Sequence, residues 1–368
     1  MDKILFVTPS FNAGGAERVV LRLLRGLDRS IANYHLVVLW NIGPLRQEMP
    51  DDVYFYDLNV RRTRYMFFSL MRLIYSLKPQ IIFSSVSRIN IGLLALKRFM
   101  PKDIKVIIRE PSIPSMSLRR QSFYRTYLFG YRKLYSRADM IVCQSRYVMG
   151  DLEENFGVDP SKMITVYNPI PIEEIESQIV DSHSPYDSGF NIVTCGRLSY
   201  VKGFDILLKA FAILSEKITD SRLTIIGDGP LRNDLERQIV YMNINSRVSL
   251  AGFQENPYIY FKHANVFVSS SRWEGLPNAV LEALTCGTPV VATDCPGGTA
   301  EIIKDSVNGW LVPPEDPESL AACLISALEN ANGIRGEPVR SSVKQFSGGV
   351  ILPKYANLFA DVLGACAQ

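Results

Sequence analysis

The sequence predicts an α/β protein with two doubly wound, parallel-sheet domains of the Rossmann-like kind. Three observations lead to this prediction. The chain has 368 residues, which at roughly 100–200 residues per domain suggests two domains. Apolar residues make up 47% of the chain, enough for two buried cores. Short apolar runs alternate with longer amphipathic segments, and this alternation stops once near the middle and then restarts.

The first alternation occupies residues 1–170. Buried strands separated by helices imply a parallel sheet that is covered on both faces. The expected strands are Ile4–Thr8, Leu36–Trp40, Gln80–Ser84, Val106–Arg109, Met140–Cys143 and Ile164–Tyr167. The expected helices between them include Ala16–Leu27, Phe67–Leu77 and Ile89–Phe99.

The alternation stops at Asn168-Pro169-Ile170-Pro171, because proline cannot continue a helix. A polar stretch over residues 181–189 resembles an interdomain linker. The second domain is expected over residues 171–349. Its expected strands are Phe190–Cys195, Leu223–Ile226, Val248–Ala251, Val266–Ser269 and Val290–Ala292, and its helices are Phe204–Glu216, Leu231–Tyr241, Ala279–Cys286 and Pro317–Leu328. A cleft between the two domains is expected.

Charge and composition exclude several classes of protein. The formal net charge is only +3, but residues 1–170 carry +11 and the remainder −8, so the two halves are expected to meet different partners. The six cysteines and three histidines are scattered, so neither a metal site nor a disulfide framework is expected. The N-terminus does not resemble a signal peptide, and no apolar stretch is long enough to span a membrane.

Three turns after expected strands could hold an anionic ligand. Gly14-Gly15 lies before a helix and is either a phosphate loop or an ordinary strand-to-helix turn. The turn from Gly196 to Gly203 contains Arg197 and Lys202, which either neutralise a diphosphate or are solvated charges. The third turn, Gly227 to Arg232, begins like a dinucleotide fingerprint but lacks its last glycine, so a dehydrogenase is not expected.

The segment from Arg272 to Pro289 is the most informative. Gly275 and Pro277 predict a turn, and Asn278 is expected to cap the following helix. Glu274 lies in the turn, and Glu282 lies about one helical turn inside the helix. Two carboxylates beside the free N–H groups of a helix start suit a ligand with both hydroxyl and phosphate groups, although a capped helix with surface acids is the alternative.

Several motifs in order resemble the retaining nucleotide-sugar glycosyltransferases of the GT-B fold, the family that builds many bacterial surface polysaccharides and lipid-linked glycans. The resemblance covers nearly the whole chain. It rests on the five segments Gly14–Arg18, Gly196–Gly203, Gly227–Pro230, Ala251–Phe253 and Glu274–Pro289.

The resemblance implies a role for each matching residue. Arg197 and Lys202 match the pair that grips the donor diphosphate, Glu274 matches the acid that contacts the donor sugar, and Glu282 matches the acid that binds the ribose. Catalytic roles would fall to Arg197, Lys202 and Glu274. The remaining donor contacts would come from Gly196, the backbone of Gly275, Leu276, Pro277 and Asn278, the loop at Phe253, and Gly14 with Gly15 from the first domain. Residues 350–368 match the family's terminal helix, which crosses back to the first domain.

The chain departs from the family at one place. Many members carry a histidine near the reacting sugar, where this sequence reads Ile107-Ile108-Arg109-Glu110. Arg109 and Glu110 are therefore expected to contact acceptor or donor. The family's chemistry implies transfer with retention, no metal and no other cofactor, and a phosphate oxygen that takes the acceptor proton.

A segment over residues 118–137 contains six basic residues, six aromatics and no acid. A basic, aromatic helix of this kind suits an anionic membrane surface, and residues 61–68 add to it. The alternative is a helix that covers the sheet and has a solvated charged face. The membrane interpretation predicts a cytoplasmic protein, peripheral on the cytoplasmic face of the inner membrane, that uses a lipid-linked glycan acceptor. No nucleic-acid-binding module is found.

Two other functions remain as alternatives: a nucleotide-sugar 2-epimerase of the same fold, and a non-catalytic nucleotide-sugar-binding subunit. The run from Thr293 to Gly298 resembles relatives that use UDP-linked hexoses or N-acetylhexosamines, so a UDP-sugar donor is expected.

Overall fold

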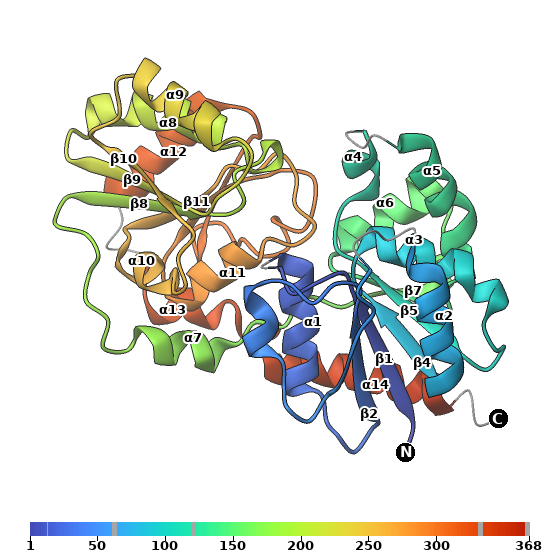
Figure 1. Ribbon diagram of the computed structural model, residues 1–368. Coiled ribbons are helices and arrows are strands. Elements are labelled where there is room, and N and C mark those ends of the chain that lie inside the picture. The colour runs from blue at the N-terminus through green and yellow to red at the C-terminus, as the bar shows by residue number, and fades with distance from the viewer. Residues whose placement is uncertain (13, 61–64, 120–122, 330–333, 365–368) are drawn as a thin grey trace. The chain divides into compact units, whose positions relative to one another are not determined.

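The computed structural model describes residues 1–12, 14–60, 65–119, 123–329 and 334–364. The chain forms two compact units (Figure 1). Unit 1 comprises Met1–Pro169 and Gly348–Gln368, and unit 2 comprises Ile170–Ser347. The chain therefore leaves unit 1 after Pro169 and returns to it at Gly348.

Unit 1 is built on a seven-stranded parallel sheet with the order β3-β2-β1-β4-β5-β6-β7. The order reverses between β1 and β4, which are hydrogen-bonded neighbours. The strands are β1 Lys3–Thr8, β2 Asn33–Val38, β3 Tyr54–Asp57, β4 Ile81–Ser84, β5 Lys105–Glu110, β6 Met140–Cys143 and β7 Met163–Thr165. The helices are α1 Gly15–Gly26, α2 Met66–Leu77, α3 Ser87–Leu96, α4 Pro114–Leu118, α5 Tyr124–Phe129, α6 Arg146–Phe156 and α14 Gly348–Gly364.

The last helix, α14, packs against the core of unit 1 through two aromatic side chains. Tyr355 and Phe359 are fully buried. The ring of Phe359 lies 5.7 Å from that of Phe83 on β4 and 6.1 Å from that of Phe6 on β1, both edge to face. Edge-to-face pairs add to the free energy gained by burial. Helix α14 is thus a structural part of unit 1, along whose sheet it runs in Figure 1.

Unit 2 is built on a six-stranded parallel sheet with the order β10-β9-β8-β11-β12-β13, the Rossmann arrangement. The order reverses between β8 and β11, which pair directly. The strands are β8 Phe190–Cys195, β9 Ser221–Ile226, β10 Val248–Gly252, β11 Val266–Ser269, β12 Val290–Thr293 and β13 Gly309–Val312. The helices are α7 Ile172–Ile179, α8 Phe204–Lys217, α9 Arg232–Tyr241, α10 Tyr258–His263, α11 Asn278–Thr285, α12 Pro317–Glu329 and α13 Glu337–Ser341.

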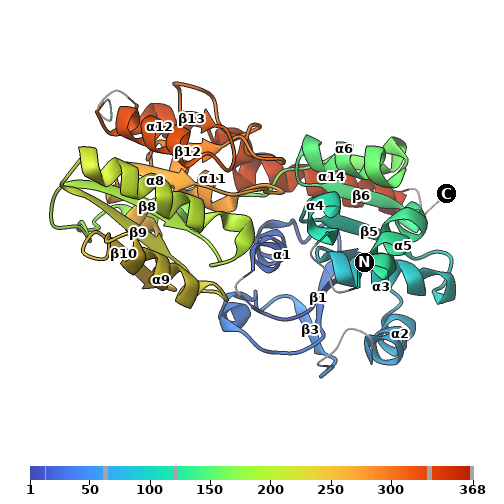
Figure 2. The same ribbon diagram turned by 90° about the horizontal axis from the view of Figure 1, so that it is seen from above.

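Helices cover both faces of the second sheet. Helices α8 and α12 lie side by side on one face, as Figures 1 and 2 show, and their apolar residues belong to one buried cluster with those of the strands. Helices α10 and α11 lie on the other face. The predicted class, two doubly wound parallel sheets, is confirmed. Strands β3 and β13, both at sheet edges, were not predicted.

Candidate active site

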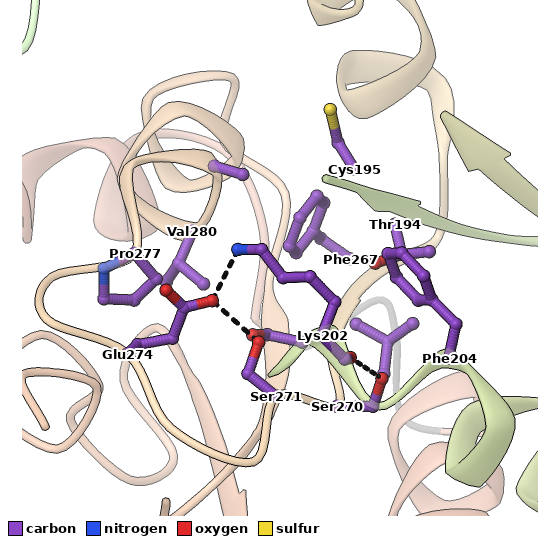
Figure 3. A pocket seen from close by; sticks show the side chains of 13 residues that line it. Thr194, Cys195, Lys202, Phe204, Phe267, Ser270, Ser271, Glu274, Pro277 and Val280 are labelled. Atoms are coloured by element: carbon purple, nitrogen blue, oxygen red, sulfur yellow. Dashed lines mark hydrogen bonds and ion pairs between the residues drawn. The ribbon is translucent and has the colours of Figure 1, made fainter. Parts of the chain in front are cut away.

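The polar residues of unit 2 gather where its two central strands end. Strands β8 and β11 are neighbours at the point where the strand order reverses. In doubly wound sheets, ligands bind beyond the carboxyl ends of these two strands. The loop after β8 carries Lys202, and the loop after β11 carries Glu274. Both line a pocket together with Pro277 and the first turn of α11 (Figure 3).

Lys202 and Glu274 form a direct ion pair in this pocket. The Lys202 Nζ lies 2.5 Å from the Glu274 Oε1, and the Ser271 hydroxyl donates to the same oxygen at 2.7 Å. The two side chains are 24% and 13% exposed, so the pair is largely shielded from water. Burial alone would lower the pKa of Lys202, but the Glu274 carboxylate more than offsets it, and the pKa is raised. Lys202 is therefore cationic at neutral pH.

The loops after β8 and β11 are tied together by their backbones. The Ser270 hydroxyl donates to the Lys202 carbonyl at 2.9 Å, and the Arg272 N–H donates to the Val201 carbonyl at 2.7 Å. Gly203 has φ +62°, and a Cβ at this position would overlap the Ser270 carbonyl oxygen. Only glycine allows this close approach, which sets Lys202 opposite Glu274.

Glu274 is also held from its other side, by the loop after β12. Its N–H donates to the Pro296 carbonyl at 3.0 Å, and its carbonyl accepts from the Gly298 N–H at 3.2 Å. Between them, Gly297 forms an isolated parallel bridge with Glu274 and has φ +131°. A Cβ on Gly297 would overlap the Glu274 carbonyl oxygen. The backbone of Glu274 thus has little freedom to shift.

Arg272 fixes the base of the same loop. Its guanidinium donates to both carboxylate oxygens of Asp205, at 2.9 and 2.8 Å, and to Glu315 at 2.8 Å. It also lies over the Tyr200 ring, 3.9 Å from the centroid. The hydrogen bonds that Arg272 donates, first to Asp205 and then to Glu315, raise the pKa of its guanidinium. Because its guanidinium is engaged by two carboxylates and an aromatic ring, Arg272 has a structural role: it holds the loop that carries Glu274.

In unit 1, the predicted site residue Arg109 is buried, with 1% of its surface exposed. Its guanidinium donates to the Ser85 hydroxyl at 2.7 Å, to the Gln144 side-chain oxygen at 2.8 Å and to the Asn168 side-chain oxygen. Burial lowers the pKa of Arg109, opposed in part by Tyr355 and Glu110. The side chain therefore joins the ends of β4 and β6 to the segment that leaves the unit.

The next residue, Glu110, is buried as well. Its carboxylate accepts from the hydroxyls of Ser87 at 2.7 Å, Ser112 at 2.8 Å and Tyr135. Burial raises the pKa of Glu110. The structure places Arg109 and Glu110 inside unit 1 and gives both side chains protein partners. Contact of either residue with acceptor or donor stays a prediction.

Two family models match the chain. "Glycosyltransferase Family 4" matches residues 13–174, and "Glycosyl transferases group 1" matches residues 176–341. The chain belongs to the GT-B glycosyltransferases. Together the two models cover most of both units.

Two relatives and one solved structure illustrate the similarity. The N-acetylgalactosamine-N,N'-diacetylbacillosaminyl-diphospho-undecaprenol 4-alpha-N-acetylgalactosaminyltransferase of Campylobacter jejuni is 29% identical over 90% of this chain and 91% of its own length. The uncharacterized glycosyltransferase MJ1059 of Methanocaldococcus jannaschii is 30% identical over 66% of this chain, and the match spans 62% of that relative. The crystal structure of Anabaena HepE in complex with UDP and glucose superimposes with a TM-score of 0.80 and 19% identity, over 98% of this chain and 100% of HepE.

In this glycosyltransferase, the structure brings some of the predicted donor-site residues together. Lys202, Glu274 and Pro277 line one pocket, and Gly196 packs against the Lys202 side chain. Arg197 follows in the same loop, and its exposed side chain makes no ion pair or hydrogen bond within the described part of the chain.

Other predicted residues lie near this pocket without lining it. Gly275 and Leu276 are buried in the turn, and Glu282 is half-buried one helical turn further on. Phe253 is 56% exposed in the loop after β10. The prediction that Asn278 caps α11 is wrong: the cap position is held by Pro277, which has no side-chain acceptor, and Asn278 is the first residue of the helix.

Gly14 and Gly15 lie after β1 in unit 1, where Gly14 precedes α1 and Gly15 is its first residue. The Glu17 carboxylate folds back onto Gly14, so that a Cβ there would overlap it. The glycine thus makes room for a side chain of its own helix.

Sequence reasoning missed Ser271, Arg272 and Gly297 as parts of the site. Ser271 and Arg272 are ordinary polar residues in the sequence, and only their partners reveal their roles. The glycine pair at 297 and 298 was a signal for a tight backbone approach that the sequence did contain.

The predicted basic, aromatic helix over 118–137 is confirmed over residues 124–137, which form an uninterrupted helical run. Residues 120–122 and 61–64 lie outside the described residues. Helix α4 ends at Leu118, α5 follows, and a π-helical turn and a 3-10 turn complete the segment. Two of its aromatics, Tyr131 and Tyr135, are buried and donate to Glu110. Its exposed residues include Phe123 and Phe129, together with Arg125, Arg132, Lys133 and Arg137.

No helix in the described ranges of the chain is long and apolar enough to cross a membrane. Across the same ranges, no group of three or more His, Cys, Asp and Glu side chains lies close enough together to hold a metal ion.

Proposed function

We propose that this glycosyltransferase transfers a hexose or N-acetylhexosamine, with retention of configuration, from a UDP-sugar to a lipid-linked glycan acceptor. The observation that carries the proposal is the pairing of Lys202 with Glu274 at the carboxyl ends of β8 and β11. A cation and a carboxylate in one shielded pocket match the two halves of a nucleotide sugar. The cation suits the diphosphate, and the carboxylate suits the hydroxyl groups of the sugar.

Each polar group near the pocket has a proposed part. Arg197, exposed and without a partner among the described residues, and Lys202 bind the diphosphate. Glu274 accepts from the sugar hydroxyls and Glu282 from the ribose. The N–H groups at the start of α11 add partial positive charge beside the leaving group. The exposed Phe253 borders the base.

In the proposed reaction, the acceptor hydroxyl oxygen forms a bond to the anomeric carbon on the face from which UDP leaves. The bond between that carbon and the phosphate oxygen breaks, and its electron pair goes to UDP. The acceptor proton passes to a phosphate oxygen. Negative charge grows on the diphosphate as the bond breaks, so Arg197 and Lys202 stabilise the transition state more than the ground state. These side chains take the role of a metal ion, and none is required.

The choice of donor and acceptor is supported by relatives. The Campylobacter protein is named for transfer of N-acetylgalactosamine to a diphospho-undecaprenol glycan, and its match extends over 90% of this chain. HepE was solved with UDP and glucose. The name of the first supports an N-acetylhexosamine and a lipid-linked acceptor. The ligands of the second support a UDP-linked hexose.

A donor screen tests the proposal. The protein is incubated with UDP- and GDP-linked sugars and a lipid-linked glycan, and the products are separated. Transfer yields free nucleoside diphosphate and a longer glycan whose new linkage has the donor's anomeric configuration. A 2-epimerase yields a new nucleotide sugar, and a binding subunit yields no product. Either of the last two results refutes the proposal.

The lipid-linked acceptor requires a membrane surface, and unit 1 offers one candidate. The segment from Phe123 to Arg137 exposes two phenylalanines, 70% and 59% exposed at positions 123 and 129, among basic side chains. Exposed aromatics among cations suit an anionic bilayer. We place the enzyme on the cytoplasmic face of the inner membrane through this surface.

Liposome flotation tests the membrane proposal. Flotation should require anionic lipid and should fall strongly when three bases of the segment, Arg125, Arg132 and Lys133, are changed to glutamine. The matched control changes three exposed bases of unit 2 to glutamine, namely Lys209, Lys217 and Arg222. The membrane proposal is contradicted if the wild type floats equally well with neutral vesicles, or if both triple variants lose flotation to the same extent.

A further inference from the structure

The ion pair between Lys202 and Glu274 occupies the pocket in which the donor is proposed to bind. In Figure 3 the lysine extends across the pocket with its ammonium directed at the carboxylate of Glu274, which lies beside the start of α11. One carboxylate oxygen, Oε1, receives both the Lys202 ammonium at 2.5 Å and the Ser271 hydroxyl at 2.7 Å. The other cation of the loop, Arg197, is exposed and has no partner within the described ranges.

Before an anion binds, Arg197 and Lys202 differ in whether they already have a protein partner. Arg197 can turn to an anion without giving up a protein partner. Lys202 can do so only by loosening its contact with Glu274. The carboxylate, 13% exposed, would then keep only the Ser271 hydroxyl among its present partners. Leaving a shielded carboxylate without its cation is unfavourable.

The two halves of a nucleotide sugar have opposite effects on this pair. A diphosphate draws Lys202 away from Glu274. A sugar places hydroxyl groups beside the carboxylate, and these can replace the lost ammonium as donors. An intact donor compensates for the broken ion pair, whereas the bare nucleoside diphosphate does not.

We propose that Glu274 restrains Lys202 until a donor sugar engages its carboxylate, so that the sugar decides how tightly the diphosphate is held. After transfer, Glu274 recovers Lys202 and thereby weakens the hold on UDP, which speeds product release. The inference rests on the proposed function. It adds that Glu274 lowers the affinity for the nucleotide product, in addition to contacting the sugar.

Calorimetric titration with UDP, and with GDP in parallel, tests the inference. Glu274→Gln keeps the size of the side chain and removes its charge. It should bind UDP at least about five-fold more tightly than the wild type, since five-fold corresponds to the upper value measured for exposed ion pairs and this pair is more shielded. It should also transfer sugar more slowly. Ser271→Ala removes the one donor among the described residues that the carboxylate would keep after Lys202 leaves, so the carboxylate should hold Lys202 more firmly and UDP binding should weaken. Ser271→Ala also keeps the test open if Glu274→Gln fails to fold.

The Glu274→Gln substitution in a Lys202→Met variant distinguishes the release of Lys202 from a general electrostatic effect of removing the Glu274 charge. In Lys202→Met, the further change Glu274→Gln should leave UDP affinity unchanged, because no cation remains to be released. The charge-matched control is Asp294→Asn, which removes an exposed carboxylate just after β12 and should not raise UDP affinity.

Three results overturn the inference. They are unchanged or weaker UDP binding by Glu274→Gln, a gain that persists in the Lys202→Met background, and an equal gain in Asp294→Asn. If neither the wild type nor the variants bind UDP or GDP at all, the proposed function itself fails, and the inference with it.

Discussion

Replacing Gly297 by alanine is expected to destabilise unit 2 and to displace Glu274. Gly297 has φ +131°, a conformation that costs an L-residue about 1–3 kcal/mol. Its Cβ would also lie 2.6 Å from the carbonyl carbon of Glu274, where ordinary contacts are about 3.5–4.0 Å. The Cβ would overlap the Glu274 carbonyl oxygen more closely still. Because both partners are backbone, the loop must move by more than about 1 Å to relieve the overlap.

The two effects set the expected magnitudes. A total cost of about 2–4 kcal/mol lowers the melting temperature of a unit of this size by roughly 5–15 °C. A displacement of about 1 Å at a group that contacts substrate costs on the order of 100-fold in turnover. Differential scanning fluorimetry measures the first effect, and the release of nucleoside diphosphate from the donor measures the second.

Two other glycines provide matched controls for the same substitution. Gly252 has φ +70° but no atom within 4 Å of its Cβ position, so Gly252→Ala should show the conformational cost alone, about 1 kcal/mol. Gly150 lies inside α6 with an open Cβ position, and Gly150→Ala should raise stability by about 0.5–1 kcal/mol. If Gly297→Ala melts and turns over like the wild type, the role assigned to this glycine is refuted.

Three further predictions concern charge, metal and pH. Arg197→Ala should reduce turnover at least about 100-fold. It should not change the melting temperature, because the exposed Arg197 side chain has no protein partner among the described residues. The control Arg222→Ala should change neither quantity, and normal turnover in Arg197→Ala would contradict the proposed binding of the diphosphate by Arg197. Excess EDTA should leave transfer unchanged, and a loss that added Mg²⁺ restores would refute metal independence. Burial lowers the pKa of His35 to about 4, so below pH 6.5 the unfolded chain binds more protons, and unit 1 should lose up to about 3 kcal/mol as the pH falls from 6.5 to 4. Acid melts should show a shallower loss for His35→Gln and an unchanged one for His183→Gln.

The central strands could be predicted because they are buried on both faces. Their residues read as continuous apolar runs, as in Val266–Ser269, which was predicted with its exact bounds. Two of the four edge strands, β3 and β13, gave no such signal. Strand β3 reads Tyr-Phe-Tyr-Asp and is exposed at both ends, and β13 begins with a glycine. An edge strand has one neighbour only, so its sequence is less constrained.

The candidate site was predictable in part for a similar reason. Lys202 and Glu274 lie in segments with a recognisable local order of residues. The partners that fix them do not: Gly297 meets Glu274 only through a bridge between two separate loops, and Ser270 meets Lys202 across 68 positions. Such pairings depend on how the loops fold back, which no local pattern encodes.

For Arg109 and Glu110, the sequence did not reveal that both side chains are buried among protein partners. The resemblance to the family led us to expect contacts with acceptor or donor at these two positions, and that expectation stays a prediction. Their partners arise from four other segments, among them Ser85 after β4, Asn168 before the crossing to unit 2, and Tyr135. Enough neutral hydroxyl and amide groups converge there to bury both charges.

The buried Glu110 carboxylate is bonded to the basic segment of unit 1, Phe123 to Arg137. Tyr131 and Tyr135 donate from the inner side of that segment to Glu110, which also accepts from Ser112 in the loop after β5 and from Ser87 at the start of α3. The exposed side of the segment carries the bases and phenylalanines proposed to meet the membrane. One carboxylate therefore joins the proposed membrane surface to the carboxyl edge of the first sheet, where folds of this kind bind ligands.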